Sequence, residues 1–171
     1  FSEFEKYWSM NQTLQWGSMP IVLKKPDLAQ ETLSAYVQTY LKEEIKEEAL
    51  VRNIAEFSRF LELAGQLNGQ ILNLENIARD VGKSSTTVNA WFQILIDTLL
   101  GTYILPYRPG FKVRETSHPK FYLFDCGVAR GCAGLLTEDL DSLWKGYAFE
   151  SVILNELSIY NEISKKNRNI L

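Results

Sequence analysis

The chain has 171 residues and a mass of 19.6 kDa, and 46% of its residues are hydrophobic while 23% are charged. This composition supports a globular protein with a buried core and excludes an intrinsically disordered chain. Eighteen basic and twenty-one acidic residues give a net charge of −3, which excludes a protein that coats nucleic acid through a uniformly basic surface. The middle segment, residues 71–137, is the exception, because it carries 7 basic and 5 acidic side chains.

Cysteine and histidine are scarce in this chain. Cys126, Cys132 and His118 are too few for a zinc site of four protein ligands, and two cysteines do not resemble a secreted disulfide framework. This cysteine usage indicates a reducing, cytoplasmic location. No run of 18 apolar residues occurs, so we expect no membrane span. The chain begins at Phe1 rather than at a methionine. We therefore expect it to be a piece of a longer protein.

The first 50 residues predict turns followed by one helix. Gly17 and Pro20 mark a turn in the aromatic-rich segment 1–26. A helix is predicted from Asp27, which would be its N-cap, with Gln30 completing a capping box. Its apolar residues recur at three-and-four spacing: Leu33, Tyr36, Val37, Tyr40, Leu41 and Ile45. The charged run 42–48 is interpreted as the solvated face of this helix.

Three more helices and a hairpin are predicted in the middle of the chain. The helices cover 54–67, 74–81 after the N-cap Asn73, and a segment that runs from Ser84 to about residue 100, where Gly101 would stop it. The hydrophobic period then changes from 3.6 to 2. This change predicts strands at 102–105 and 120–124, joined by the loop 106–119.

The last 50 residues predict a turn and a long helix. Asp125 is expected to cap the turn into a short helix or irregular piece at 128–136, in preference to holding a metal. A last helix is predicted over about 143–159. Its apolar residues surround the helix, so we expect burial on more than one side: Tyr147, Phe149, Ile153, Leu157 and Tyr160.

Residues 74–93 fit a helix-turn-helix motif. Ala78 is the small residue expected where the two helices cross, and Gly82 lies at the turn. Four apolar residues are placed to face the core: Ile77, Val81, Val88 and Trp91. Lys83 departs from the pattern, which often has an apolar residue there. With the helix before it and the hairpin after it, the motif predicts a winged helix.

A winged helix binds duplex DNA or holds a partner protein, and the sequence leaves both open. The outward residues of the second motif helix and the basic residues of the hairpin are the candidate DNA contacts: Lys83, Ser85, Thr86, Asn89 and Gln93 on the helix side, and Arg108, Lys112, Arg114 and Lys120 on the wing. None of the helix residues is an arginine. A polar outward face is also what any solvated helix shows.

Three other residue patterns are weaker indications of a binding or catalytic site. Residues 82–85, Gly-Lys-Ser-Ser, resemble the end of a phosphate-binding loop but lack the glycine and the strand that such a loop requires. Glu150 lies between apolar neighbours, where burial would raise its pKa for acid–base chemistry, although an exposed position is the simpler interpretation. His118 is interpreted as loop surface.

Several short segments together resemble the C-terminal region of a large family of uncharacterised bacterial and archaeal AAA-type ATPases. The matching segments, in the family order, are residues 16–20 (WGSMP), 36–45 (YVQTYLKEEI), 57–62 (FSRFLE), 120–128 (KFYLFDCGV), 146–150 (GYAFE) and 155–157 (NEL). The resemblance implies a P-loop ATPase domain before the chain, then a winged helix, then a restriction-endonuclease-like domain. Glu150 would be the acid of the first helix of that nuclease-like fold.

The sequence thus predicts a mainly α fold with a small β-hairpin and a winged helix-turn-helix core. Three parts are expected: a linker and helical segment at 1–50, the winged helix at 51–130, and the helical start of a nuclease-like domain at 131–171. The predicted function is a non-catalytic interaction module of an AAA-type ATPase, with duplex DNA, the ATPase domain or another copy of the chain as partners. The fragment itself would need no cofactor, whereas ATP and Mg²⁺ belong to the parent protein. The alternatives are a stand-alone winged-helix transcriptional regulator and the scaffold half of a nuclease.

Overall fold

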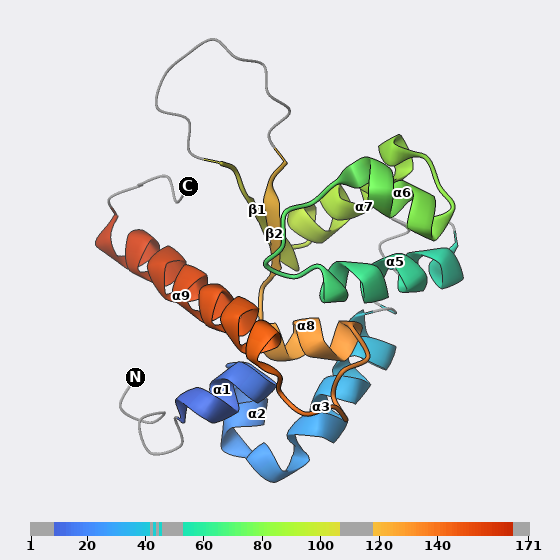
Figure 1. The fold of residues 1–171 in the computed structure, drawn as a ribbon. Coiled ribbons are helices and arrows are strands. Elements are labelled where there is room, and N and C mark those ends of the chain that lie inside the picture. Colours follow the sequence, from blue (N-terminus) through green and yellow to red (C-terminus); the bar gives the residue numbers. More distant parts are fainter. Residues whose placement is uncertain (1–8, 42, 44, 46–52, 107–117, 166–171) are drawn as a thin grey trace.

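A computed structural model describes residues 9–41, 43, 45, 53–106 and 118–165 (Figure 1). The N-terminal elements are α1 (Met10–Trp16), α2 (Pro20–Lys24), the 3₁₀ turn η1 (Pro26–Leu28), α3 (Ala29–Ala35) and the π-helical η2 (Tyr36–Leu41). They are followed by α5 (Ile54–Gln66), α6 (Leu74–Val81), α7 (Ser85–Asp97), β1 (Gly101–Ile104), β2 (Lys120–Leu123), α8 (Cys126–Cys132) and α9 (Ser142–Ser164). The prediction of a mainly α fold with a small hairpin is confirmed.

Helix α8 lies at the centre of the molecule, with α1 and α3 on one side and α5 on the other (Figure 1). Glycines allow this close packing, because a Cβ on Gly65 of α5 would lie 2.6 Å from the backbone nitrogen of Ala133. A Cβ on Gly127 would lie 2.1 Å from the carbonyl oxygen of Trp16. One hydrophobic core cluster contains residues from all three predicted parts of the chain. The division of the chain into those three parts remains a prediction.

Helices α6 and α7 lie at the upper right of Figure 1, and the hairpin of β1 and β2 stands beside them near the middle. Gly82 ends α6 in the left-handed conformation, at φ 66°, and Ala78 and Ile77 are buried as expected. The backbone N–H of Lys83 donates to the carbonyl of Ala78, which closes the turn. The order of three helices followed by an antiparallel hairpin agrees with the order that the sequence predicts, and the winged-helix assignment itself stays a prediction.

Aromatic rings join the helices to the hairpin. Phe92 of α7 lies between Phe60 of α5 and Phe121 of β2, with ring centroids 4.8 and 4.9 Å away. In the hairpin Tyr103 pairs with Phe121 and Thr102 pairs with Tyr122. Because paired residues share a face, one face of the sheet carries the aromatic residues packed on α7, and the other carries Tyr122 and turns away from it.

The first predicted helix differs at its start. Asp27 is not an N-cap, because it lies inside η1, and α3 begins at Ala29 without a side-chain cap. Pro26 starts this 3₁₀ turn, which the N–H of Leu28 closes on the carbonyl of Lys25. The predicted stripe is nonetheless buried at Leu33, Val37, Leu41 and Ile45. Of the charged run 42–48, Glu43 is exposed, and residues 42, 44 and 46–48 lie outside the described residues.

Helix α7 is shorter than predicted. It ends at Asp97, and Leu99 takes a left-handed conformation with φ 60° while the N–H of Leu100 bonds to the carbonyl of Leu95. Gly101 begins β1 and does not stop the helix. A Cβ on Gly101 would lie 2.3 Å from the ring of Phe121, so close packing in the hairpin explains this glycine.

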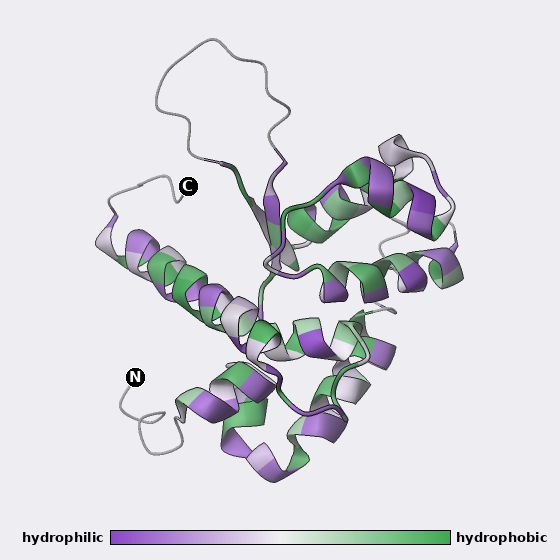
Figure 2. Ribbon diagram, in the orientation of Figure 1, coloured by the Kyte–Doolittle hydropathy of each residue, from purple (hydrophilic) through white to green (hydrophobic). Residues whose placement is uncertain are grey.

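The prediction that α9 is buried on several sides is wrong. Trp144, Ala148, Ser151 and Leu154 form one buried face. The apolar residues on the opposite face are exposed, and Figure 2 shows hydrophobic segments of this helix alternating with hydrophilic ones. No helix within the described ranges is both long enough and apolar enough to cross a lipid bilayer.

Candidate interaction surfaces

The outward face of α7 is polar and exposed, as predicted. Ser85, Thr86, Asn89 and Gln93 are all exposed. The hydroxyl of Ser84 accepts from the N–H of Thr87 at 3.1 Å and so caps the helix. The side-chain amide of Gln93 donates to Asp97 at 2.7 Å. The face therefore presents neutral hydrogen-bonding groups at the start and middle of the motif's second helix.

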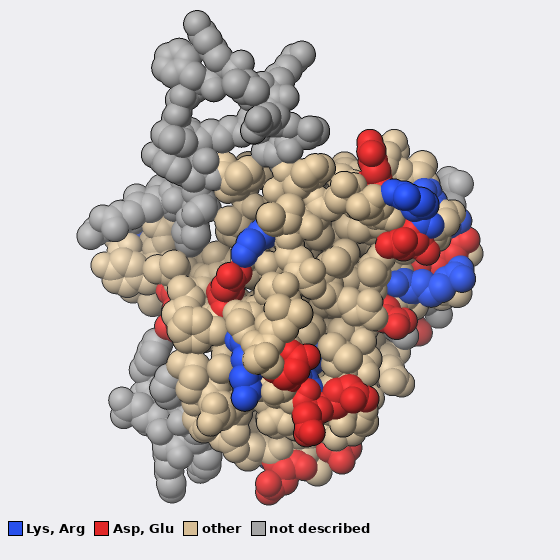
Figure 3. Space-filling model, viewed as in Figure 1, with Lys and Arg blue, Asp and Glu red and all other residues tan. Residues whose placement is uncertain are grey.

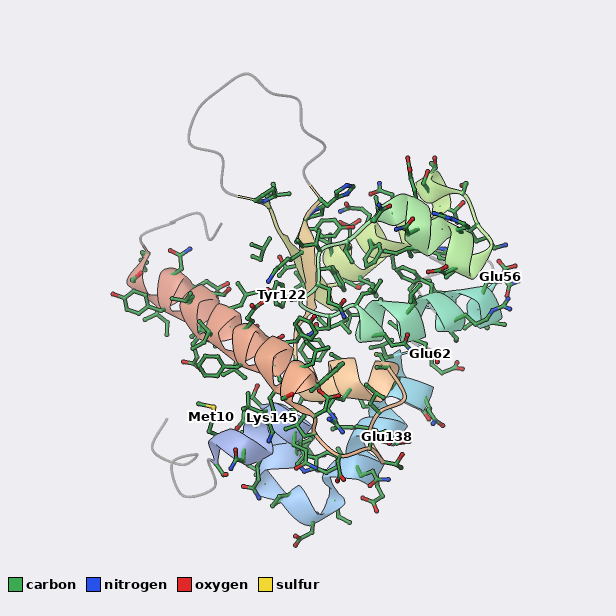
Figure 4. All side chains as sticks on the ribbon, viewed as in Figure 1. Met10, Glu56, Glu62, Tyr122, Glu138 and Lys145 are labelled. Carbon is green, nitrogen blue, oxygen red and sulfur yellow. The ribbon has the colours of Figure 1, made fainter. Side chains whose placement is uncertain are left out.

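The described cations of the predicted DNA-binding set are already paired. Lys83 forms an ion pair with Glu56 of α5 at 2.7 Å, and Lys120 forms one with Glu150 of α9 at 2.7 Å. Arg108, Lys112 and Arg114 lie outside the described residues. Figure 3 shows basic and acidic side chains side by side over the outer end of α5 and α6, and Figure 4 places Glu56 at that end. No continuous basic surface is formed by the described residues on this face.

Glu150 joins the hairpin to α9. Its Oε2 accepts both from Lys120 Nζ and from the hydroxyl of Tyr122, each at 2.7 Å, and Figure 4 shows Tyr122 between the hairpin and α9. Burial by itself would raise the pKa of Glu150, but the bonds from Lys120 and Tyr122 outweigh it and hold the pKa below its usual value. The alternative of a raised pKa is therefore not supported, and the exposed position that the sequence favours is confirmed.

An apolar groove opens between the hairpin and α9 beside this cluster. Its volume is about 280 Å³, and its lining residues come from β1, β2 and α9: Ile104, Tyr122, Phe149, Glu150, Ile153, Leu154 and Leu157. The groove continues into what we call the α9 stripe, the exposed residues Phe149, Ile153, Leu157, Tyr160 and Ile163. Sequence analysis identified most of these residues but assigned them to the core.

Asp125 joins two segments that are far apart in the sequence. Its Oδ1 accepts from the N–H groups of Gly127 and Val128 at 2.8 and 3.0 Å, so it caps α8 as predicted. Its Oδ2 accepts from the N–H and hydroxyl of Ser18 at 2.6 and 3.2 Å. Burial raises the pKa of this carboxyl, although the four donors oppose that shift. Sequence reasoning missed Ser18 as the partner.

Gly17 shows how tight this junction is. Its φ is 80°, and a Cβ there would lie 2.0 Å from Oδ1 of Asp125. The segments 16–20 and 120–128, which carry part of the resemblance described above, therefore meet in space. We interpret the junction as structural, because the Asp125 carboxylate is buried and both oxygens accept backbone hydrogen bonds.

Buried polar side chains fix the position of α9 and of the loop before it. Asn68 accepts from the N–H of Leu123 at 2.8 Å and donates to Ser151 at 3.0 Å. Asn155 donates to the carbonyl of Phe124 at 2.7 Å. Arg130, which is buried, donates to the carbonyls of Leu135 and Glu138, and burial lowers the pKa of its guanidinium. The inner face of α9 is therefore held firmly to the hairpin and α5.

Two further sequence candidates have local roles. In the 82–85 segment, Gly82 caps α6 and Ser84 caps α7. His118 is exposed before the hairpin's second strand, as predicted. No group of three His, Cys, Asp or Glu side chains suited to a metal ion occurs among the residues that the structure describes.

Comparison with known proteins assigns the chain to a family. It belongs to the family described as "Domain of unknown function (DUF8612)", whose model matches residues 7–139. It is similar to uncharacterized proteins of Mycobacterium bovis and Mycobacterium tuberculosis, each 21% identical over 124 residues. The matches cover 68% of this chain and 28% of each mycobacterial protein, so the chain corresponds to about a quarter of their length. No solved structure matches it.

Proposed function

We propose that this chain is a non-catalytic interaction module, built around a winged helix, that belongs to an AAA-type ATPase. The observation that carries the proposal is the exposed polar face of α7, because the second helix of a helix-turn-helix is the one that contacts its partner. The module would transmit partner binding to the ATPase domain. The resemblance of the six short segments supports the link to an ATPase, and the greater length of the mycobacterial relatives is compatible with it.

The described surface favours a protein partner over DNA. Affinity for duplex DNA depends strongly on cations that contact phosphates, and Lys83 and Lys120 already have carboxylate partners. Neutral groups such as Asn89 and Gln93 suit hydrogen bonds at a protein interface. A second candidate is duplex DNA, as in a stand-alone transcriptional regulator. The exposure of four polar side chains on α7 favours that candidate.

A titration with duplex DNA separates the two candidates. Fluorescence anisotropy at low and at moderate salt should show weak binding of this chain that disappears at moderate salt. The wing variant Arg108→Gln/Lys112→Gln/Arg114→Gln should likewise show no binding to DNA at moderate salt. Tight binding that persists there, and that Asn89→Ala weakens for one DNA sequence but not for others, would instead establish the regulator.

The link to an ATPase is tested in the full-length protein. Asn89→Glu on α7 should change the rate of nucleotide hydrolysis or its response to the partner, while the melting temperature stays the same, because Asn89 is exposed and has no acidic neighbour one turn away. Gln30→Glu is a matched control, because Gln30 is an exposed helical glutamine far from α7 in the sequence. A full-length protein without nucleotide hydrolysis would contradict the proposal.

A further inference from the structure

Helix α9 has two apolar faces, and the described part of the chain covers one of them. The buried face contains Trp144, Ala148 and Leu154, which pack on the body of the protein. The α9 stripe recurs every three or four residues on the other side of the helix, so it forms a continuous band. Figure 1 shows that the C-terminal part of α9 extends away from α8 and from the hairpin.

The α9 stripe is comparable in area to the largest apolar patch on a typical monomer, and such patches are often binding surfaces. Its five side chains are between 43 and 74% exposed. With roughly 150–250 Å² for an aromatic residue and somewhat less for an aliphatic one, they leave on the order of 500 Å² of apolar surface open. Two such bands facing each other would bury about 1,000 Å², which is the lower limit for a specific interface, so the groove residues of the hairpin must contribute as well.

The apolar character of the α9 stripe indicates what kind of surface can cover it. The five residues of the stripe are apolar, and Glu156, which is exposed between Ile153 and Tyr160, is the charged side chain on the same side of the helix. Because apolar side chains dominate this side of α9, it is complementary to a second apolar surface that leaves Glu156 in contact with water. The chain itself supplies such a surface, because the groove beside Phe149 and Ile104 is apolar and has a volume of about 280 Å³. The projecting end of α9, with Tyr160 and Ile163, is an apolar helix able to enter it.

We propose that a second copy of this chain covers the α9 stripe, with the two α9 helices antiparallel across a twofold axis. The projecting half of each helix then fills the groove between the hairpin and α9 of the other copy. Such an interface is self-complementary, and both apolar surfaces are covered at once. The Lys120–Glu150–Tyr122 cluster lies at the polar rim of the interface. The proposal does not depend on whether α7 binds protein or DNA.

The mass in solution tests this proposal. Sedimentation velocity or light scattering of the 171-residue chain should show a mass that rises from 19.6 kDa toward twice that value as the concentration increases. Ile153→Glu/Leu157→Glu should raise the dissociation constant of the dimer at least about 100-fold, because each copy would bring two unpaired carboxylates into the interface. Both positions are more than 40% exposed, so the monomer should keep its helical content and melting temperature when both are measured at low concentration.

Two controls make the result specific. Ile21→Glu changes an exposed isoleucine of α2, outside the stripe, and should dimerise like the parent chain. Ile153→Gln/Leu157→Gln adds no charge and should still weaken the dimer at least about tenfold. A parent chain that stays monomeric to several hundred micromolar, or a glutamate variant that still dimerises like the parent, would overturn the proposal.

Discussion

The hydrogen bonds of the buried Asp125 carboxylate are expected to make a large contribution to the stability of this fold, and substitution of Asp125 measures it. Its two carboxylate oxygens serve different segments: Oδ1 caps α8, and Oδ2 holds the backbone and hydroxyl of Ser18. Asp125→Asn keeps the shape of the side chain and one acceptor for the N-cap. It places an amide N–H₂ opposite the Ser18 N–H, so that two donors face each other.

The expected cost of Asp125→Asn is about 2 kcal/mol, the value of one lost hydrogen bond to a charged group at a buried site. Asp125→Ala should cost about 3–4 kcal/mol, because the helix cap, worth about 1 kcal/mol, is lost as well. Ser18→Ala removes the hydroxyl bond of 3.2 Å and keeps the backbone bond. It should therefore cost less than about 1 kcal/mol.

Urea denaturation followed by tryptophan fluorescence measures these free energies of unfolding. Asp139→Asn is the matched control, because Asp139 is exposed, and it should change stability by less than about 0.5 kcal/mol. The order Ser18→Ala, then Asp125→Asn, then Asp125→Ala is the essential result. If Asp125→Asn were as stable as the parent chain, the junction between 16–20 and 120–128 would not depend on Oδ2.

Three further predictions follow from single positions. Leu99→Gly should stabilise the chain by up to about 1 kcal/mol in thermal or urea unfolding, because Leu99 is exposed and has a φ of 60° that glycine adopts without strain. A melting temperature below that of the parent would contradict this view of α7's end. Gly65→Ala should destabilise by about 1–3 kcal/mol, since its Cβ would push α5 away from the backbone of α8; an unchanged urea midpoint would show that the two helices separate easily. Glu150→Gln should weaken the attachment of α9 to the hairpin at neutral pH. Because the folded pKa of Glu150 is lowered, its contribution is present above the unfolded pKa and declines as the pH falls through the folded value. The difference in melting temperature between parent and variant should therefore shrink below about pH 4, and a difference that stayed constant with pH would argue against the ion pair.

Local signals in the sequence determined the elements of this fold. Asn73 and Ser84 cap α6 and α7 through bonds to the next residues of their own helices, so their identity and position were sufficient to predict both helix starts. Gly82 lies between them and was also predictable, because glycine readily adopts the left-handed conformation that ends a helix. The buried stripe from Leu33 to Ile45 followed from helical spacing, although Pro26 moved the helix start past Asp27.

The pairing of the candidate site residues depended on the tertiary structure. Lys83 and Lys120 are free cations in the sequence, and their carboxylate partners lie 27 and 30 residues away, on other elements. Ser18 and Asp125 are separated by 107 residues, so no local pattern links them. Phe149 and Leu154 are both apolar residues of one helix, and the arrangement of the hairpin and α8 decides that Leu154 is buried while Phe149 is exposed. A sequence records the preference of each side chain for water or for a core, but the packing of elements decides which apolar side chains the core has room to cover.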